Sequence, residues 1–227
     1  EHNEDSFFVD KRLGLFIVAD GIGGHQGGDV ASEMGVDIIS SAIKEALKND
    51  GDIPIIIKKV ICEANDKIYT RATQNINLNG MGTTIVFALC RKDKIYIAHI
   101  GDSRAYLIRD GEIKRLTQDH SIVEELIKAG EITEESARKH HLRHVVTKAL
   151  GSEEPPEPDI IYTSLQDRDY LLLCTDGLTD MLTDKEIRGI ILNINNGDPQ
   201  EICEELICSA NKKVGKDNIT AILIRFD

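Results

Sequence analysis

Five acidic segments of this sequence stand where a run of apolar residues begins or ends. Three of them close such a run and two come just before one: Asp20, Asp102 and Asp176, then Asn3-Glu4-Asp5 and Asp217-Asn218. Short apolar runs of this kind are typical of buried β-strands, so each acid is expected at a strand end. A single Asp-Gly pair after a strand is usually only a turn. Five acidic strand ends in one chain need a shared explanation.

Metal binding is the chemistry that this pattern favours. Carboxylates that lie close together repel one another and raise each other's pKa. Hard divalent cations neutralise such a cluster, and Mg²⁺ and Mn²⁺ prefer oxygen ligands. An acidic calcium-binding structural domain is an alternative, but the sequence lacks the pattern of an EF-hand loop. We therefore expect a metal site wherever the fold brings these strand ends together.

The rest of the sequence supplies the elements that would position the acids. Expected strands cover residues 7–9, 13–19, 83–90, 94–100, 104–109, 112–116, 169–175 and 218–226. Expected helices begin at residues 29, 54, 119, 131, 183 and 199. Successive strands joined by short turns favour antiparallel sheets over βαβ repeats. The expected fold class is α+β, a four-layer α-β-β-α sandwich of two mainly antiparallel sheets flanked by helix pairs.

Composition limits the organisation and the partners of the chain. Its 227 residues, 41% of them hydrophobic, suit one domain over residues 1–227. A formal net charge of −12 argues against nucleic acid or an anionic membrane as partner, and no apolar run approaches a membrane span. The five cysteines include no CxxC pair, which favours free thiols and a cytoplasmic location over a zinc site or disulfides.

Two further groups of residues could carry chemistry. His140, His141 and His144 lie in a basic segment, but their spacing does not match a His-x-x-x-His pair on one helix face. We interpret this segment as part of an exposed lobe rather than as a metal site. Ser103 follows Asp102 without a paired base, so a structural role is favoured over a nucleophilic one.

The ordered motifs of the chain resemble those of the metal-dependent serine/threonine protein phosphatases, the PPM or type 2C family, and most of all its compact bacterial branch. The motifs that carry the resemblance extend over nearly the whole chain: Asn3-Glu4-Asp5, Asp20-Gly21-Ile22-Gly23-Gly24-His25, Gly82-Thr83-Thr84, Gly101-Asp102-Ser103-Arg104, Asp119-His120-Ser121, Lys148-Ala149-Leu150-Gly151, Asp176-Gly177-Leu178 and Asp217-Asn218-Ile219-Thr220. Each motif alone is weak, whereas the ordered set is specific.

This resemblance implies a site for two Mg²⁺ or Mn²⁺ ions at one end of the sheets. By position in the motifs, Asp20 would bridge both ions, and the carbonyl of Gly21 would bind the first. Asp176 and Asp217 would bind the second ion. Glu4 would act through metal-bound water. These side chains would be the catalytic residues, because the family uses no side-chain nucleophile.

A third ion is also implied, since Asp102 matches the residue that holds it together with Asp176 in bacterial members. The family's third ligand for this ion falls near His144. Animal members carry a candidate general-acid histidine where this chain has Ile22, and we expect a structural role for the nearest histidine, His25. The family arginine that binds substrate phosphate, and a strand, would precede Glu1.

The function implied is hydrolysis of phosphoserine and phosphothreonine on proteins by a hydroxide that bridges the two metals. The partners would be phosphoproteins, the targets of a serine/threonine kinase in bacterial signalling, and the enzyme would be a monomer. A flap lobe at residues 119–147 would influence substrate choice. The alternative is a catalytically weak, phosphatase-like regulatory or binding domain, and its support is that the phosphate-binding arginine lies outside this sequence.

Overall fold

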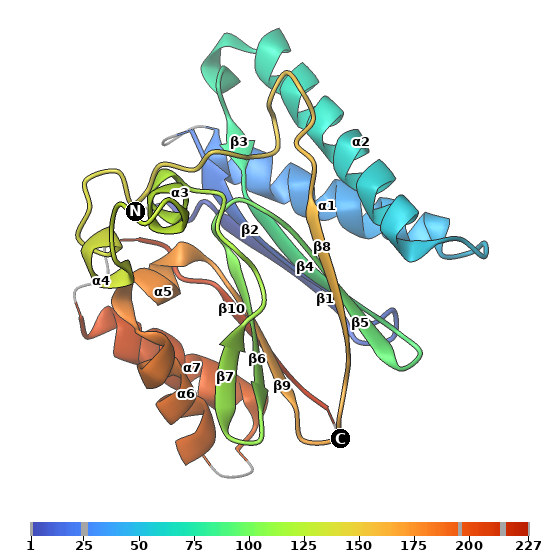
Figure 1. Ribbon diagram of the computed structural model, residues 1–227. Coiled ribbons are helices and arrows are strands. Elements are labelled where there is room, and N and C mark those ends of the chain that lie inside the picture. The colour runs from blue at the N-terminus through green and yellow to red at the C-terminus, as the bar shows by residue number, and fades with distance from the viewer. Residues whose placement is uncertain (1, 24–26, 195–196, 214–216, 227) are drawn as a thin grey trace.

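The computed structural model describes residues 2–226 except 24–26, 195–196 and 214–216. Two antiparallel β-sheets pack face to face, and helices cover the outer side of each sheet (Figure 1). The α+β class and the four-layer α-β-β-α arrangement expected from the sequence are therefore confirmed. Among the helices of the described residues, none has the length and apolar character needed to cross a membrane.

The first sheet pairs its strands in the order β1-β2-β4-β5-β8, and the short β3 pairs with β2. Its strands are β1 (Asp5–Asp10), β2 (Leu15–Ile22), β3 (Gly82–Thr83), β4 (Ile85–Arg91), β5 (Lys94–Ile100) and β8 (Asp159–Ser164). In the turn after β1, Asp10 Oδ1 accepts hydrogen bonds from the backbone N–H groups of Arg12 and Leu13, at 2.9 and 2.8 Å. This turn helps to fix the register between β1 and β2.

The second sheet has the order β10-β9-β6-β7. Its strands are β6 (Arg104–Arg109), β7 (Glu112–Arg115), β9 (Tyr170–Cys174) and β10 (Ala221–Arg225). The hairpin between β6 and β7 turns at Asp110 and Gly111, whose φ angles are 50° and 76°. Both residues are left-handed, as the tightest hairpin turn requires.

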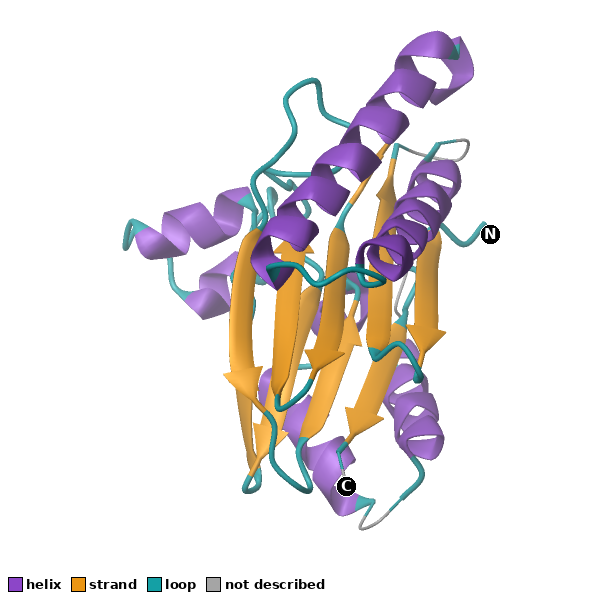
Figure 2. Ribbon diagram, turned by 90° about the vertical axis from the view of Figure 1, so that its right-hand side faces the viewer, coloured by secondary structure: helices purple, strands orange, loops and turns teal. Residues whose placement is uncertain are grey.

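Helices form the two outer layers and a separate lobe. They are α1 (Gly28–Ala46), α2 (Ile53–Gln74), α3 (Ile122–Lys128), α4 (Glu134–Ala137), α5 (Asp176–Met181), α6 (Asp184–Asn193) and α7 (Pro199–Asn211), with a 3₁₀ turn η1 (Ile76–Leu78). α1 and α2 cover the first sheet, and α5, α6 and α7 cover the second. Figures 1 and 2 show α3 and α4 set beside one end of the strands. We call residues 119–147, which contain them, the lobe.

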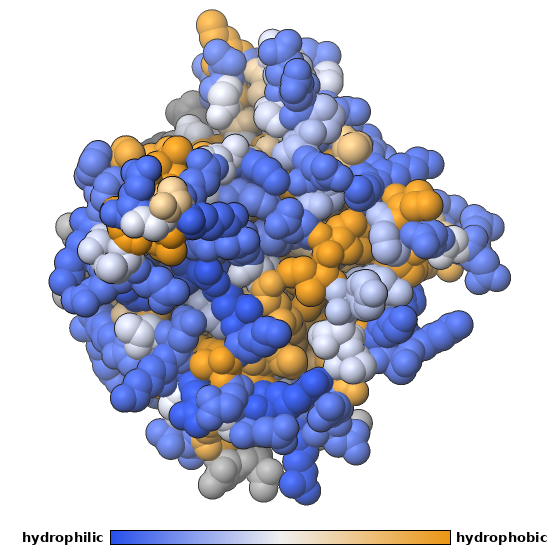
Figure 3. Space-filling model, in the orientation of Figure 1, coloured by the Kyte–Doolittle hydropathy of each residue, from blue (hydrophilic) through white to orange (hydrophobic). Residues whose placement is uncertain are grey.

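Three apolar clusters correspond to the three interfaces between layers. One lies between α1, α2 and the first sheet, one between the two sheets, and one between the second sheet and its helices. Figure 3 shows a mostly hydrophilic face with an apolar band across it, over the region between the edges formed by β7 and β8. The layers hold the strand ends in fixed positions.

Some elements differ from those expected. β8 and α5 were not predicted. α3 begins at Ile122 rather than at Asp119, because the hydroxyl of Ser121 accepts a hydrogen bond from Glu124 N at 3.4 Å and caps the helix there. α4 is only the four residues Glu134–Ala137, shorter than the expected helix over residues 131–139.

Candidate metal centre

The sheet topology brings the acidic strand ends to one end of the sandwich. Asp5 lies directly opposite Asp20 in the pairing of β1 with β2. Asp102 follows the end of β5, and Asp176 follows β9 as the first residue of α5. Asp217 precedes β10, which pairs antiparallel with β9. All five acids therefore lie at the same end of their strands, which we call the acidic rim.

The pKa values of these carboxylates are raised by burial and by one another's charges, because the side chains lie close together. Burial raises the pKa of Asp20 well above its ordinary value, and the charges of Asp176, Asp5, Asp102 and Asp217 raise it further. Burial, then Asp176, raises the pKa of Asp102 to about 8. Asp217, the most exposed of the five, also has a raised pKa, from partial burial and from Asp176. A cluster with such pKa values favours either protons or a cation.

Hydrogen bonds hold Asp20 and Asp5 in place. The backbone N–H of Asp20 donates to Thr84 Oγ1 at 3.1 Å, and its carbonyl accepts from Thr84 N at 2.8 Å. Asp5 Oδ2 accepts from Thr175 Oγ1 at 3.0 Å. By contrast, Asp176 Oδ1 is buried and has no hydrogen-bond partner among the described residues. A buried carboxylate oxygen without a hydrogen-bond donor lacks a partner, and a hard cation could supply one.

Tight backbone packing joins the rim loops. Gly21 N donates to Glu4 O at 3.2 Å, and a side chain at Gly21 would clash with the backbone of Gly28. Glu4 N donates to Asn218 Oδ1 at 2.8 Å. The carbonyl of Asn218 in turn packs so closely on Gly177 that a side chain there would clash with it. The loops that carry Glu4, Asp217 and Asp176 are thus held against one another.

Asp5 was not among the site residues selected from the sequence. Glu4 was selected, and its carboxylate packs against Gly28 at the start of α1. The Asp5 carboxylate lies among the rim acids: burial raises its pKa to about 6, hydrogen bonds from Thr220 and Thr175 lower it, and Asp176 and Asp217 raise it. The register between β1 and β2 would have identified Asp5 as a site residue, because directly opposed residues such as Asp5 and Asp20 lie on the same face of the sheet.

One lobe histidine reaches the rim. His144 Nδ1 lies 3.8 Å from Asp176 Oδ2 and 3.5 Å from Asp180 Oδ2. The nearby carboxylate of Asp176 raises the pKa of His144, and the charge of Asp180 raises it further. Asp180 was also missed by the sequence analysis, although it lies four residues after Asp176 and so on the same face of α5. His141, like His144, has an exposed position in the lobe.

Two other expectations concern single residues. Ser103 is buried and its Oγ is hydrogen bonded to Thr84 Oγ1 at 2.8 Å, as expected for a structural side chain. The structural role expected of His25 concerns a residue outside the described part of the chain, as does Gly24 of the same motif.

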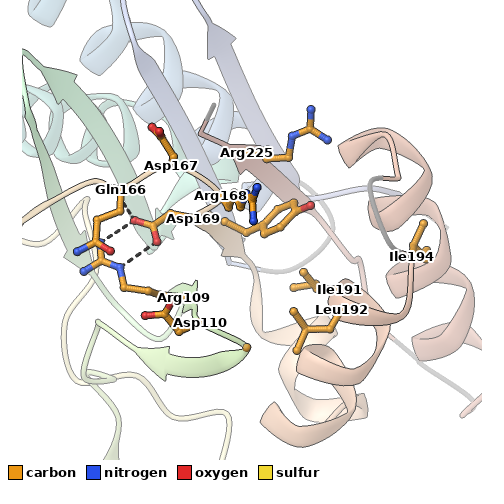
Figure 4. Close-up of a pocket in the computed structure, with 12 residues that line it drawn as sticks. Arg109, Asp110, Gln166, Asp167, Arg168, Asp169, Ile191, Leu192, Ile194 and Arg225 are labelled. Atoms are coloured by element: carbon orange, nitrogen blue, oxygen red, sulfur yellow. Dashed lines mark hydrogen bonds and ion pairs between the residues drawn. The ribbon is translucent and has the colours of Figure 1, made fainter.

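A cavity of about 690 Å³ lies at the opposite end of the strands from the rim (Figure 4). Its lining includes Arg109, Tyr170 and Arg225, each at the far end of a strand whose other end is near a rim acid. Figure 4 shows Arg109 turned toward Asp169, with which it forms an ion pair at 2.6 Å. Asp169 is 1% exposed, so this pair is a structural element of the sandwich rather than part of the rim.

Comparison with known proteins gives consistent matches over the chain. Residues 1–221 match the family described as Protein phosphatase 2C. The chain is 42% identical over 231 residues to "Serine/threonine phosphatase stp" of Listeria monocytogenes, covering 100% of this chain and 91% of the relative. It is 39% identical over 213 residues to "Protein phosphatase PhpP" of Streptococcus pneumoniae, covering 92% and 85%.

Solved structures give the same result. Serine/threonine phosphatase Stp1 from Staphylococcus aureus superposes with a TM-score of 0.91 at 35% identity, covering 100% of this chain and 90% of that one. The catalytic domain of the serine/threonine protein phosphatase PstP, solved in complex with two manganese ions, has a TM-score of 0.87 at 32% identity, covering 98% and 90%.

Proposed function

The chain belongs to the protein phosphatase 2C family, and from this premise we propose which of its residues carry out the reaction. It is a metal-dependent protein serine/threonine phosphatase, which hydrolyses phosphoserine and phosphothreonine with Mg²⁺ or Mn²⁺. We propose that Asp20 contacts both of two ions and that the Gly21 carbonyl contacts the first. Asp176 and Asp217 contact the second.

The remaining rim residues complete the proposed site. Asp102 would hold a third ion together with Asp176, and Glu4, on the loop beside the rim, would act through water. Asp5 accepts a hydrogen bond from Thr175 and adds negative charge beside Asp20. The observation that carries the proposal is that Asp20 lies among four other carboxylates, which raise its pKa further. The unpartnered oxygen of Asp176 supports it.

The donor set suits hard divalent ions. Its members are carboxylate and carbonyl oxygens, which Mg²⁺ and Mn²⁺ prefer over softer ligands. When bound, such ions activate water as a nucleophile and neutralise charge on the phosphoryl group. The chain itself brings the negative charges to one end of the sheets and supplies the hydrogen bond from Thr175 that orients Asp5.

The described residues supply no competing side-chain nucleophile at the rim. Burial raises the pKa of the nearby Cys174 thiol to about 12, so it stays protonated and unreactive at neutral pH. Ser103, next to Asp102, is committed to its hydrogen bond with Thr84. Both facts support direct attack by water on the phosphorus atom.

The setting of the enzyme is also part of the proposal. We propose a single domain over residues 1–227 in which the lobe, residues 119–147, forms a flap beside the site. All five cysteines are free thiols, which supports the cytoplasm as compartment. The substrates are proteins phosphorylated by a serine/threonine kinase of the same bacterium, and the enzyme acts as a monomer.

Hydrolysis of p-nitrophenyl phosphate and of a phosphothreonine peptide tests the proposal. We expect both to be hydrolysed with Mn²⁺, and hydrolysis to stop when EDTA is added and to return with fresh Mn²⁺. A chain that binds the phosphopeptide but hydrolyses neither substrate would favour a regulatory, phosphatase-like domain. Hydrolysis that persists in EDTA would contradict the metal site itself.

A further inference from the structure

A pair of stacked histidines lies behind the rim, outside the proposed metal site. His99, near the end of β5, is fully buried, and His120, at the start of the lobe, is 8% exposed. Their ring centroids are 4.7 Å apart with an angle of 5° between the planes. Asp159, the first residue of β8, lies opposite His99. Ligand atoms of the three residues lie within 4.8 Å of one another, the spacing of a possible cation site.

The hydrogen bonds argue against a cation there. Gly101 N donates to His120 Nδ1 at 3.1 Å, so Nδ1 carries the lone pair. The lone pair of Nδ1 is therefore not free for a cation, and only Nε2 could bind one. This Nε2 lies 3.6 Å from Asp159 Oδ1 and 3.3 Å from the ammonium group of Lys148. A positive charge at that distance disfavours a second cation.

The same contacts form a two-point clamp on one residue, Gly101, through its backbone N–H and its backbone carbonyl. His120 N donates to Gly101 O at 2.9 Å, while His120 Nδ1 accepts from Gly101 N. Gly101 has φ +99°, and a Cβ on it would lie 2.6 Å from Thr84 Cγ2, so this loop has one tight path. The next residue along that path is Asp102. The His120 ring therefore sets where the backbone of Asp102 begins.

Surrounding contacts keep the ring neutral and in place. Burial lowers the pKa of His120 to about 4, with smaller contributions from His99 and Lys148. The His99 ring stacks against the His120 ring. A 2.8 Å hydrogen bond between Nε2 of His99 and Gln118 O orients the His99 ring. His120 O accepts from Thr147 N at 2.8 Å, at the other end of the lobe. One residue thus joins the Asp102 loop to both ends of the lobe.

We propose that His120 is a positioning residue, which holds the Gly101 peptide through its Nδ1 atom and thereby places the Asp102 carboxylate at the acidic rim. This inference rests on the proposed metal-binding role of Asp102. It assigns to the Asp119-His120-Ser121 motif a mechanical role in the site. It also links the lobe to a metal ligand, because the lobe begins at the residue that forms the clamp.

Asparagine and glutamine at position 120 separate this role from simple packing. Asparagine can place its Oδ1 near the position of Nδ1, whereas glutamine places its polar end nearer that of Nε2. The first readout is hydrogen exchange of the Gly101 amide by NMR in the metal-free protein, which does not depend on activity. The second is kcat and KM for p-nitrophenyl phosphate over a range of Mn²⁺ concentrations. His141→Asn, at an exposed position in the lobe, is the matched control.

Loss of one buried hydrogen bond corresponds to about a tenfold change. We therefore expect His120→Gln to lose about tenfold in Gly101 protection and, at equal Mn²⁺, about tenfold in kcat, with KM little changed. His120→Asn should keep both values within about threefold of wild type. If His120→Gln does not fold, His120→Ala gives the same comparison.

Three outcomes would overturn the proposal. The first is equal Gly101 protection in the asparagine and glutamine variants, or an asparagine variant that fails to fold when alanine folds. The second is a loss of protection in His120→Gln without any loss of kcat, because the clamp would then not act on the site. The third is a wild-type protein without metal-dependent hydrolysis, which removes the function, while the exchange data still show whether the clamp exists.

Discussion

Replacing Asp5 with asparagine should stabilise the metal-free protein at neutral pH. The folded state raises the pKa of Asp5 from 3.8 to about 6, chiefly by burial and then through Asp176 and Asp217. Between these two pKa values the unfolded chain loses a proton that the folded chain retains. The free energy of unfolding therefore falls as the pH rises from about 4 to about 6. Asparagine carries no charge, and its Oδ1 can still accept the hydrogen bond from Thr175.

The size of the effect follows from the shift. One pKa unit corresponds to about 1.4 kcal/mol, so a rise from 3.8 to about 6 amounts to about 3 kcal/mol once both states would be ionised. At pH 4.5 only the first part of this difference has developed, about 1 kcal/mol. Asp5→Asn should therefore raise the free energy of unfolding by about 3 kcal/mol at pH 7.5 and by about 1 kcal/mol at pH 4.5.

Urea denaturation in EDTA, followed by circular dichroism, measures both values. Asp66→Asn is the control, because Asp66 is exposed on α2. Its free energy of unfolding should change by less than about 0.5 kcal/mol at either pH. A gain for Asp5→Asn that is absent at pH 7.5, or that is the same at both pH values, would refute the idea that Asp5 lies in a buried cluster of carboxylates.

Other expected outcomes follow from the same contacts. Asp176→Asn should lower kcat with Mn²⁺ by at least about a hundredfold while the circular dichroism spectrum stays native, because the change removes a ligand charge and little packing. Retained activity would show that Asp176 does not bind the second ion. Deleting residues 121–143 should reduce turnover of a phosphoprotein far more than that of p-nitrophenyl phosphate, and equal losses would contradict a role for the lobe in substrate choice. Arg109→Ala leaves the buried Asp169 carboxylate unpaired and should lower the free energy of unfolding by about 3 kcal/mol in urea titrations; a change below about 1 kcal/mol would show that the pair is dispensable.

Strong hydrophobic runs made most of the sandwich predictable. β5 and β6 match the expected ranges, and α6 begins where Thr183 signals a cap, with the reciprocal hydrogen bonds of a capping box. β8 escaped prediction because it is an edge strand with no fully buried residue, so its sequence lacks a clear apolar face. α5 was missed because it is six residues long and opens with an Asp-Gly pair that reads as a turn.

The candidate site was predictable only in part, because local sequence patterns do not encode contacts between distant segments. Acids at strand ends were visible as a local pattern, and the topology then placed Asp20, Asp102, Asp176 and Asp217 at one rim. The place of Asp5 depends on strand register. The clamp formed by His120 depends on a contact between the lobe and the loop after β5, and no local pattern encodes such a contact.

Anomalous diffraction from Mn²⁺-soaked crystals is the most direct test of the metal site. The absorption edge of manganese locates and counts the ions independently of any assumption about their ligands. We expect two strong peaks at the acidic rim, both contacted by Asp20 and one of them by Asp176 and Asp217, and a third peak beside Asp102 and Asp176. Peaks remote from these three side chains, or an empty rim in crystals of active protein, would contradict the account.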